Sequence, residues 1–349
     1  MSLIVLAGDV GGTGTRLAVY RLDGKVRQTL AQADFPSQSF ALFEHILDNF
    51  LAESDVEIEV ACFGVAGPVR DGIARVTNLP WQISVAGISQ RYAIRQVFLI
   101  NDLEANAWGL SALAEDDYLV LQQGESQQGN AAIIAAGTGL GEAGLYHDGC
   151  QLQPFATEGG HADFSPNSSQ DIEFLRYLKK IYSHVSWEQV LSGHGLVHIH
   201  NFLCLQQGGK TANERVEEMQ QDDAASVISQ CAAAGDDEVC VQALEMFVTL
   251  FGAEAGNLAL KMMARGGLFI GGGIASKNSQ FFTQEHFMQA FLAKGRMQPL
   301  LETMPVKLIL NNRTALYGPA LYAGCHAACV GSNENGASSP IFPSESESC

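Results

Sequence analysis

Short apolar runs alternate with glycine-rich and polar turns along most of the chain, which predicts strands interleaved with helices. Leu3–Ala7 and Leu17–Tyr20 have the length and the β-branched or aromatic content of strands, and the glycine-rich segment Gly8–Arg16 separates them. Residues 3–22 therefore predict a β-hairpin with glycines at its turn. Further elements are expected as a helix from about Phe40 to Ala52, strands at Val60–Val65 and Val97–Ile100, and a helix over Glu104–Leu113. This alternation indicates an α/β domain with a partly parallel sheet.

The same pattern starts again in the second half of the chain. Ala131–Ala136 is an apolar run, Gly137–Gly141 is rich in glycine, and Ala143–Tyr146 is apolar again. A repeated strand, glycine turn and strand is much less expected by chance than one copy. We therefore predict two similar domains that face a shared nucleotide cleft. The remaining pattern predicts helices within Asp171–Leu203, over Glu238–Ala264 and over Asn312–Ala328, and strands at Leu268–Ile270 and Val306–Leu310.

The length of the chain fits this division. A chain of 349 residues is long for one hydrophobic core. We expect a small α/β domain formed by residues 1–111 together with about 300–330, and a large α/β domain formed by residues 112–299. Residues 331–349 are rich in Ser, Glu, Asn and Pro, which predicts a disordered tail.

The charge and the apolar content exclude some classes of partner. A formal charge of −18 argues against nucleic acids and anionic membranes, because both select basic surfaces. No apolar run reaches the ~20 residues that span a bilayer, and no basic segment precedes the first strand, so a cytoplasmic location is expected. The eight cysteines form no Cys-x-x-Cys pair, which favours scattered thiols over a zinc site.

The segment Gly8–Arg16 carries the strongest chemical signal. Glycines at positive φ let several backbone N–H groups converge, and such a nest binds phosphate. The carboxylate of Asp9 would repel phosphate unless Mg²⁺ lies between them, so the segment predicts a nucleotide with Mg²⁺. It is neither a P-loop, which ends in Gly-Lys-Ser/Thr, nor a dinucleotide fingerprint, which a helix follows. An ordinary glycine-rich hairpin remains the alternative.

Two polar residues follow the second of the early buried strands. Asn101 and Asp102 come directly after Val97–Ile100. Ligands of open α/β sheets bind beyond the carboxyl ends of strands, where an amide and a carboxylate suit a substrate with hydroxyl groups. The alternative is a turn with a helix N-cap, since Asn and Asp favour both.

A carboxylate and an imidazole lie close together in Thr157–His161. Two glycines separate Glu158 from His161, and glycines disfavour a helix. We expect a loop that presents both side chains to a polar ligand. A solvated loop with an incidental histidine is the alternative.

Two further segments are weaker candidates. Glu188 is expected in a short helix, with Ser186 as its N-cap and Gln189 at the capping-box position. Gly271–Gly273 follow a strand, where glycines permit close approach of a ligand such as adenosine. Three glycines can equally form only a connection from strand to helix.

In their order and spacing, these segments resemble the bacterial glucokinase family, within the wider hexokinase–actin–heat-shock ATPase superfamily. The resemblance covers about residues 3–328. It rests on Gly8–Arg16, Gly64–Pro68, Leu99–Ala105, Ala136–Gly141, Glu158–His161, Glu188 and Leu268–Ile274. It implies two duplicated ribonuclease-H-like (actin-like ATPase) α/β domains that flank a nucleotide and sugar cleft. No Cys-rich zinc motif follows His161, which separates the chain from a related sugar-kinase family that includes repressors.

The resemblance also implies a reaction, in which ATP phosphorylates the 6-hydroxyl of glucose to give glucose 6-phosphate and ADP. Asp102 would be the general base that accepts the hydroxyl proton. The implied sugar ligands are Asn101, Asp102, Glu158, His161 and Glu188. The implied ligands of ATP are Gly8, Asp9, Val10, Gly11, Gly12, Thr13, Gly137, Thr138, Gly139, Gly271, Gly272, Gly273 and Ile274, with Mg²⁺ at Asp9, directly or through water.

Two other functions stay open at this point. The same carboxylates could serve a kinase for another hexose or an amino sugar. A non-catalytic sugar sensor of the same fold is the alternative from a different class. Related kinases are often dimers, which leaves a homodimer open as well.

Overall fold

The computed structural model describes residues 2–23, 26–52, 56–125, 127–207 and 224–330. The predicted tail at 331–349 lies outside these described residues. The chain divides into two compact units. Unit 1 consists of residues 1–105 with the chain from Ala315 onward, and unit 2 consists of Asn106–Thr314.

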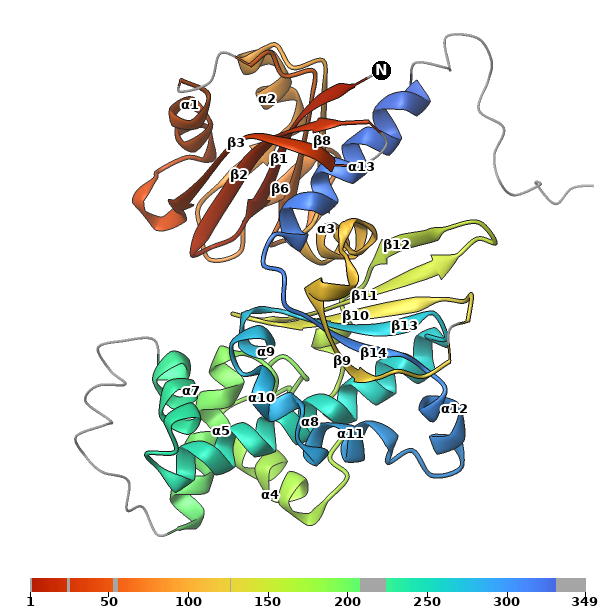
Figure 1. Ribbon diagram of the computed structural model, residues 1–349. Coiled ribbons are helices and arrows are strands. Elements are labelled where there is room, and N and C mark those ends of the chain that lie inside the picture. The colour runs from red at the N-terminus through yellow and green to blue at the C-terminus, as the bar shows by residue number, and fades with distance from the viewer. Residues whose placement is uncertain (1, 24–25, 53–55, 126, 208–223, 331–349) are drawn as a thin grey trace, which may run out of the picture. The chain divides into compact units, whose positions relative to one another are not determined.

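Unit 1 contains a mixed five-stranded sheet of order β3-β2-β1-β4-β8 (Figure 1). Its strands are β1 (Leu3–Val10), β2 (Gly14–Leu22), β3 (Val26–Pro36), β4 (Val60–Val65) and β8 (Gln96–Asn101). β2 is antiparallel to both β1 and β3, whereas β4 is parallel to β1 and β8 is parallel to β4. The carboxyl ends of β1, β4 and β8 therefore lie at one edge of the sheet.

A small sheet and four helices complete unit 1. The small antiparallel sheet consists of β5 (Val69–Arg70), β6 (Ile73–Arg75) and β7 (Gln82–Ser84). The helices are α1 (Phe43–Ala52), α2 (Val85–Tyr92), α3 (Asp102–Gly109) and α13 (Thr314–Val330), of which α3 and α13 cross the boundary to unit 2. α1 begins at Phe43 rather than near Phe40, because Phe40 has an extended backbone after a 3₁₀ turn. Phe43 packs edge-on against Phe63 of β4, which fixes α1 to the sheet.

Unit 2 contains a six-stranded sheet of order β12-β11-β10-β13-β14-β9. Its strands are β9 (Tyr118–Gln122), β10 (Ala131–Ala136), β11 (Leu140–His147), β12 (Leu152–Ala156), β13 (Gly267–Gly271) and β14 (Val306–Ile309). β11 is antiparallel to both β10 and β12, β13 is parallel to β10, and β14 is parallel to β13. Order and directions repeat those of the sheet in unit 1, with β9 added at the edge. The predicted duplicated α/β fold is confirmed.

The helices of unit 2 gather on one side of its sheet (Figure 1). They are α4 (Ser169–Leu178), α5 (Gly193–Gln206), α7 (Ala224–Ala234), α8 (Glu238–Met262), α9 (Gly273–Lys277), α10 (Ser279–Phe282), α11 (Glu285–Leu292) and α12 (Gln298–Glu302). Within the described ranges, α8 is the one helix long and apolar enough to cross a membrane, but 72% of its apolar window is buried inside the protein. Its composition is that of a core helix.

The chain returns to unit 1 at residue 315 rather than near residue 300. The reason is that β14 pairs with β13 and so belongs to the sheet of unit 2. Other differences are local. The helix expected over Glu104–Leu113 begins at Asp102 and ends at Gly109, where a 3₁₀ turn follows.

The short helix expected around Glu188, with Ser186 as its N-cap, is wrong, because Ser186 forms a β-bridge with Asp163 and residues 188–190 form a turn. The Gln189 side chain does accept from the Ser186 N–H (3.0 Å), as in a capping box. However, the Trp187 N–H donates to the Ala162 carbonyl O (3.0 Å), and the Glu188 N–H is likewise bonded to the 159–161 segment. Trp187 is also fully buried, so tertiary contacts determine the backbone here.

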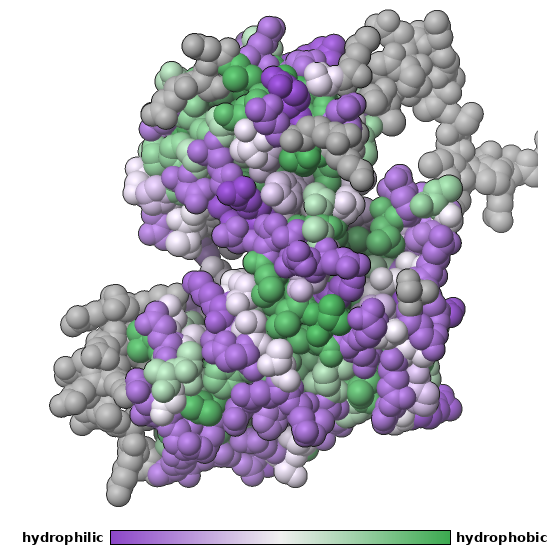
Figure 2. All heavy atoms as spheres, viewed as in Figure 1, coloured by the Kyte–Doolittle hydropathy of each residue, from purple (hydrophilic) through white to green (hydrophobic). Residues whose placement is uncertain are grey.

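Figure 2 shows a face on which hydrophilic and apolar side chains are mixed. Two clusters of buried apolar residues form the cores, one in each unit. Cys62, Cys204, Cys231 and Cys240 are buried, whereas Cys150 and Cys325 are exposed.

Candidate functional site

The turn between β1 and β2 is held by a buried serine. Ser37 donates from Oγ to the Gly11 carbonyl O (2.7 Å), and the same Oγ lies 2.9 Å from Thr15 Oγ1. The Gly11 N–H donates across the turn to the Gly14 carbonyl O (3.0 Å). These bonds fix the backbone of the hairpin, and they use the Gly11 N–H within the turn.

The glycines of this turn allow close packing. None of the glycines in Gly8–Gly14 has a positive φ, so the positive φ values expected from the sequence are wrong. A Cβ at Gly12 would lie 2.8 Å from the Thr77 carbonyl O, and a Cβ at Gly8 would overlap the Phe63 ring. A side chain at Gly8 or Gly12 would therefore collide with neighbouring atoms.

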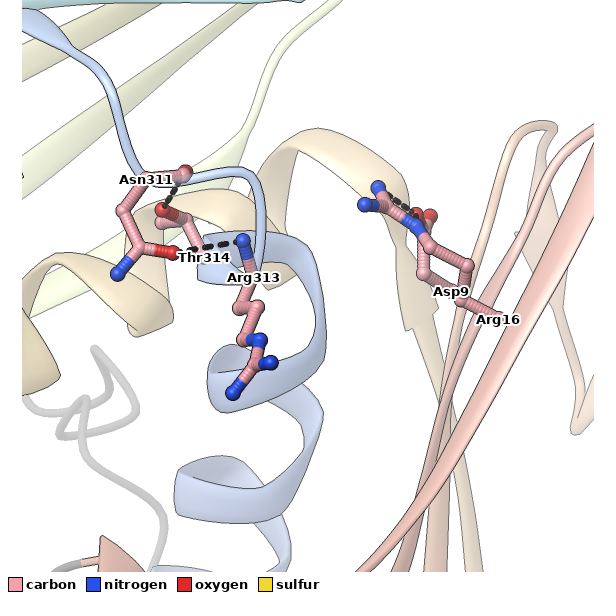
Figure 3. Close-up of polar contacts among 5 residues, drawn as sticks. All are labelled: Asp9, Arg16, Asn311, Arg313 and Thr314. Carbon is pink, nitrogen blue, oxygen red and sulfur yellow. Dashed lines mark hydrogen bonds and ion pairs between the residues drawn. The ribbon is translucent and has the colours of Figure 1, made fainter. Parts of the chain in front are cut away.

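Asp9 and Arg16 are register partners on β1 and β2, and their side chains point toward each other (Figure 3). Arg16 donates to Asp9 Oδ2 from Nη2 (2.7 Å) and from Nε (3.1 Å). The two side chains are 20% and 33% exposed, so protein shields the pair in part. Arg16 had no role in the sequence-based prediction, although its position opposite Asp9 in the hairpin is a signal that could have identified it.

The donor set at Asp9 fits a Mg²⁺ ion that arrives with a nucleotide. Mg²⁺ keeps several waters and takes one or two carboxylates together with phosphate oxygens. No cluster of three or more His, Cys, Asp or Glu side chains suited to a metal occurs in the described part of the chain. Phosphates and water would therefore supply most ligands of such an ion.

β8 ends at Asn101 and α3 begins at Asp102, the two residues expected to meet the substrate. Val10, Val65 and Asn101 are register partners across β1, β4 and β8, so the hairpin and Asn101 lie at the same edge of the sheet. Two strand spacings separate them, which is about 10 Å. The Leu103 N–H donates to Asn101 Oδ1 (2.9 Å) and to Asp102 Oδ1 (3.0 Å). These are the bonds of a helix start, and they also fix both side chains at this edge.

The corresponding edge of unit 2 carries the second glycine turn. The Gly137 N–H donates to the Gly139 carbonyl O (2.8 Å). Ala135 is the register partner of Gly271, so β13 ends beside this turn. Gly272 has a φ of +90°, and a Cβ there would collide with the backbone of β10, so only glycine fits. Thr138 lies within the turn, and Gly273 and Ile274 open α9.

Glu188 connects this turn to the loop that contains Glu158 and His161. Its Oε2 accepts from the Leu140 N–H (3.1 Å) and fills the place of a Cβ at Gly139. Its backbone N–H donates to the Gly160 carbonyl O (2.8 Å). Its Oε1 lies 3.9 Å from His161 Nδ1.

Glu158 and His161 stand at the two ends of a 3₁₀ turn, Gly159–His161. His161 Nε2 lies 3.9 Å from Glu158 Oε2, which is too long for a hydrogen bond. The side chains of Glu158, His161 and Glu188 are 77%, 59% and 34% exposed. Unit 2 thus brings these three residues together beside the glycine turn, with polar atoms accessible to a ligand.

Two cavities differ in their relation to these residues. In unit 1, a cavity of about 500 Å³ beside the hairpin is lined by residues that include Asp9, Thr15 and Arg16. In unit 2, a cavity of about 760 Å³ lies among α4, α5, α8 and α11, and none of the predicted site residues lines it. The cavity of unit 2 is therefore separate from the predicted site residues.

Comparison with known proteins identifies the family. A family model described as glucokinase matches residues 6–326. The chain is 39% identical to a glucokinase from Synechocystis sp., over 93% of this chain and 98% of that protein. It is 38% identical to a glucokinase from Nostoc sp., over 92% of this chain and 98% of that protein.

Solved structures agree in fold. A glucokinase from an Antarctic psychrotroph matches with a TM-score of 0.80 and 31% identity, over 92% of this chain and 99% of that one. A ROK family glucokinase from Streptomyces griseus, solved with glucose and AMPPNP, matches with a TM-score of 0.64 and 21% identity, over 92% and 99%. The second likeness shows the fold alone. The family match across residues 6–326 and the identity over nearly the whole of its relatives place this chain in the glucokinase family.

Proposed function

We propose that this chain transfers the γ-phosphoryl group of ATP to the 6-hydroxyl of glucose, which gives glucose 6-phosphate and ADP. The observation that carries the proposal is the register of Val10, Val65 and Asn101. It brings a phosphate-type hairpin and an Asn-Asp pair to one sheet edge, so a phosphate donor and a hydroxyl acceptor can be held within reach of each other.

Asp102 is the proposed general base. Aspartate is ordinarily ionised at neutral pH, and its weak basicity is sufficient because phosphoryl transfer has a loose transition state in which the proton can leave late. Asp102 opens α3, and the Leu103 N–H fixes its carboxylate. Positioning of the sugar hydroxyl then contributes more to the rate than basicity does.

The proposed sugar ligands are Asn101, Asp102, Glu158, His161 and Glu188. Carboxylates accept hydrogen bonds from hydroxyl groups, whereas the amide and the imidazole can donate as well as accept. A site built from such groups rejects a substrate that lacks the matching hydroxyl, because its polar atoms would stay unpaired. The exposed carboxylate of Glu158 and imidazole of His161 are available for these contacts.

The proposed ligands of the nucleotide are Gly8–Thr13, Gly137–Gly139 and Gly271–Ile274, with backbone N–H groups toward the phosphates and the last segment near adenosine. The N–H groups of Gly11 and Gly137 are not among these donors, because each is bonded within its own turn. Mg²⁺ that accompanies ATP would neutralise charge on the phosphates. Asp9 would hold this ion through its water shell, and Arg16 would keep the carboxylate in place. With a net charge of −18, the protein depends on these few groups to hold phosphates. We place the reaction in the cytoplasm, where ATP is supplied, and leave a homodimer as part of the proposal.

The test is ADP release with Mg·ATP against glucose, mannose, fructose, N-acetylglucosamine, N-acetylmannosamine and no sugar. Turnover that strongly favours glucose, with glucose 6-phosphate as product, is expected. Turnover with an amino sugar or another hexose would overturn the substrate but keep the reaction. Glucose binding without any turnover would make the chain a sensor and overturn the reaction as well.

A further inference from the structure

Two buried carboxyl groups lie behind the turn that carries Glu158 and His161. Glu142 of β11 is 2% exposed, and Glu254 of α8 is fully buried. A buried carboxylate is costly unless it is paired and hydrogen-bonded. The proposed reaction gives neither residue a role, although both belong to the same unit as the turn.

The two carboxyl groups have different partners. Glu254 accepts from Asn257 Nδ2 (2.8 Å) and pairs with Lys261 Nζ (3.3 Å). Lys294, whose Nζ donates to a carbonyl of α8, adds a second positive charge that faces Glu254. By contrast, Glu142 Oε1 has no hydrogen-bond partner among the described residues. The negative charge therefore belongs on Glu254, and a proton belongs on Glu142.

The charges around Glu142 support this assignment. Burial, and then the negative charge of Glu254, raise the pKa of Glu142 to about 7, and Lys261 only partly opposes them. Burial also raises the pKa of Glu254, against the effect of Asn257 and the two lysines. A protonated Glu142 can donate its O–H to the Glu254 carboxylate, which two ionised groups could not do.

Glu142 is also in direct contact with the turn. Its carboxyl group fills the place that a Cβ at Gly159 would need. Its backbone carbonyl O accepts from Thr157 Oγ1 (2.8 Å), and that hydroxyl in turn accepts from the Gly159 N–H (3.2 Å). Both the side chain and the backbone of Glu142 thus support the segment between Thr157 and His161.

We propose that Glu142 and Glu254 form a buried pair that holds one proton, and that Glu142 is a positioning residue that sets the Glu158–His161 turn for the sugar. This inference rests on the proposed function, in which Glu158 and His161 bind the substrate. Loss of the shared proton leaves two like charges that interact in a buried position. Because Asn257 and Lys261 hold the Glu254 carboxylate in place, we expect the repulsion to displace Glu142 and, with it, Gly159, which contacts the Glu142 carboxyl group.

The experiment compares Glu142→Gln, Glu142→Ala and the wild-type chain. Gln keeps the shape and one donor but cannot ionise, whereas Ala removes the support beneath Gly159. Glu285→Gln is the matched control, because Glu285 is exposed on α11 of the same unit. KM values for glucose and for Mg·ATP are measured between pH 6 and pH 8.5.

The expected result separates glucose from ATP. Glu142→Ala raises the KM for glucose about tenfold or more at pH 6, with little change in the KM for Mg·ATP, because a small displacement of ligands is costly. In Glu142→Gln, the KM for glucose stays near the wild-type value at pH 6. Above about pH 7 the KM for glucose rises in the wild type, and the part of this rise that is due to Glu142 is absent in Glu142→Gln. The difference in the KM for glucose between the wild type and Glu142→Gln at each pH is the quantity that matters, because every other group of the site is the same in both proteins.

Equal changes in both KM values for Glu142→Ala, or the same pH profile in Glu142→Gln and the wild type, would overturn the positioning role. A readout without substrate separates this failure from failure of the proposed function. Hydrogen exchange of the peptide around residues 157–163, corrected for intrinsic rates, should quicken from pH 6 to pH 8.5 in the wild type and the control but not in Glu142→Gln. If the wild type does not phosphorylate glucose but shows this exchange pattern, only the proposed function fails. If it phosphorylates glucose and the exchange pattern is absent, only the carboxyl pair fails.

Discussion

At the scale of single residues, the β1–β2 hairpin combines a carboxylate and a guanidinium on neighbouring strands. Asp9 alone suggested a bridging Mg²⁺, but Arg16 lies directly across the hairpin and binds the same carboxylate. At the start of α13, Asn311 Oδ1 accepts from the Arg313 N–H (2.8 Å) and the Asn311 carbonyl O accepts from Thr314 Oγ1 (2.9 Å; Figure 3). Residue type identified Asp9 as a candidate, whereas its pairing with Arg16 depends on the register of the hairpin.

His161→Ala should raise the KM for glucose about 10–100-fold and change the KM for Mg·ATP little, because the sugar loses one hydrogen bond of a polar site. The measurement is steady-state kinetics with each substrate varied in turn. His184→Ala is the matched control, since His184 is 58% exposed against 59% for His161 and is bonded to Asp163 instead. Equal effects on the two KM values would count against His161 as a sugar ligand.

At the scale of elements, agreement with the sequence was best where local pattern and tertiary packing favour the same structure. β4 and β10 were predicted with their observed bounds, since each is a short apolar run buried in a sheet. α8 was predicted to within two residues at its end, because apolar positions recur along it and Asp237 caps its start.

The turn at Trp187 shows why the rest could not be predicted. Ser186 and Gln189 form half of a capping box, which the sequence does contain. The backbone N–H groups of Trp187 and Glu188 are nevertheless bonded to residues 160 and 162, a pairing that no local pattern reveals. Glu142 was missed for a related reason. A lone Glu in an apolar strand signals a buried carboxyl group, but its partner Glu254 is far away in the sequence.

Asp237→Ala should lower the free energy of unfolding by about 1 kcal/mol, because Asp237 Oδ1 accepts from the Val239 N–H (2.8 Å) at the start of α8. Urea unfolding followed by circular dichroism measures it. Asp236→Ala removes the neighbouring carboxylate, which is exposed and lies outside the helix, and should change stability much less. Similar losses in the two variants would mean that charge, and not capping, stabilises the helix.

At the scale of the whole molecule, two sheets of matching order and direction each present a glycine turn at the carboxyl end of a first strand. The sequence carried this duplication as a repeated motif, and family membership agrees with it. The predicted site residues are divided between the units: Asn101 and Asp102 belong to unit 1, and Glu158, His161 and Glu188 belong to unit 2.

Stability of the whole chain should depend on pH through Glu142. Its pKa is raised from 4.5 to about 7 in the folded state, so its contribution is fully present below pH 4.5 and is lost as the pH rises through about 7. Glu142→Gln should therefore gain about 2–3 kcal/mol relative to the wild type between pH 5 and pH 8. Urea unfolding at the two pH values, with Glu285→Gln as control, measures this. A difference that does not change with pH would contradict the raised pKa.

The proposed reaction is tested most directly by the turnover of glucose by Asp102→Asn beside the wild type and the exposed control Asp116→Asn. The substitution keeps the shape of the side chain and removes its ability to accept a proton. We expect glucose turnover by the wild type and the control, and a kcat lower by about 10²–10⁴ in Asp102→Asn, with little change in glucose affinity. A variant that keeps more than about a tenth of the wild-type kcat would contradict the role of Asp102 as general base.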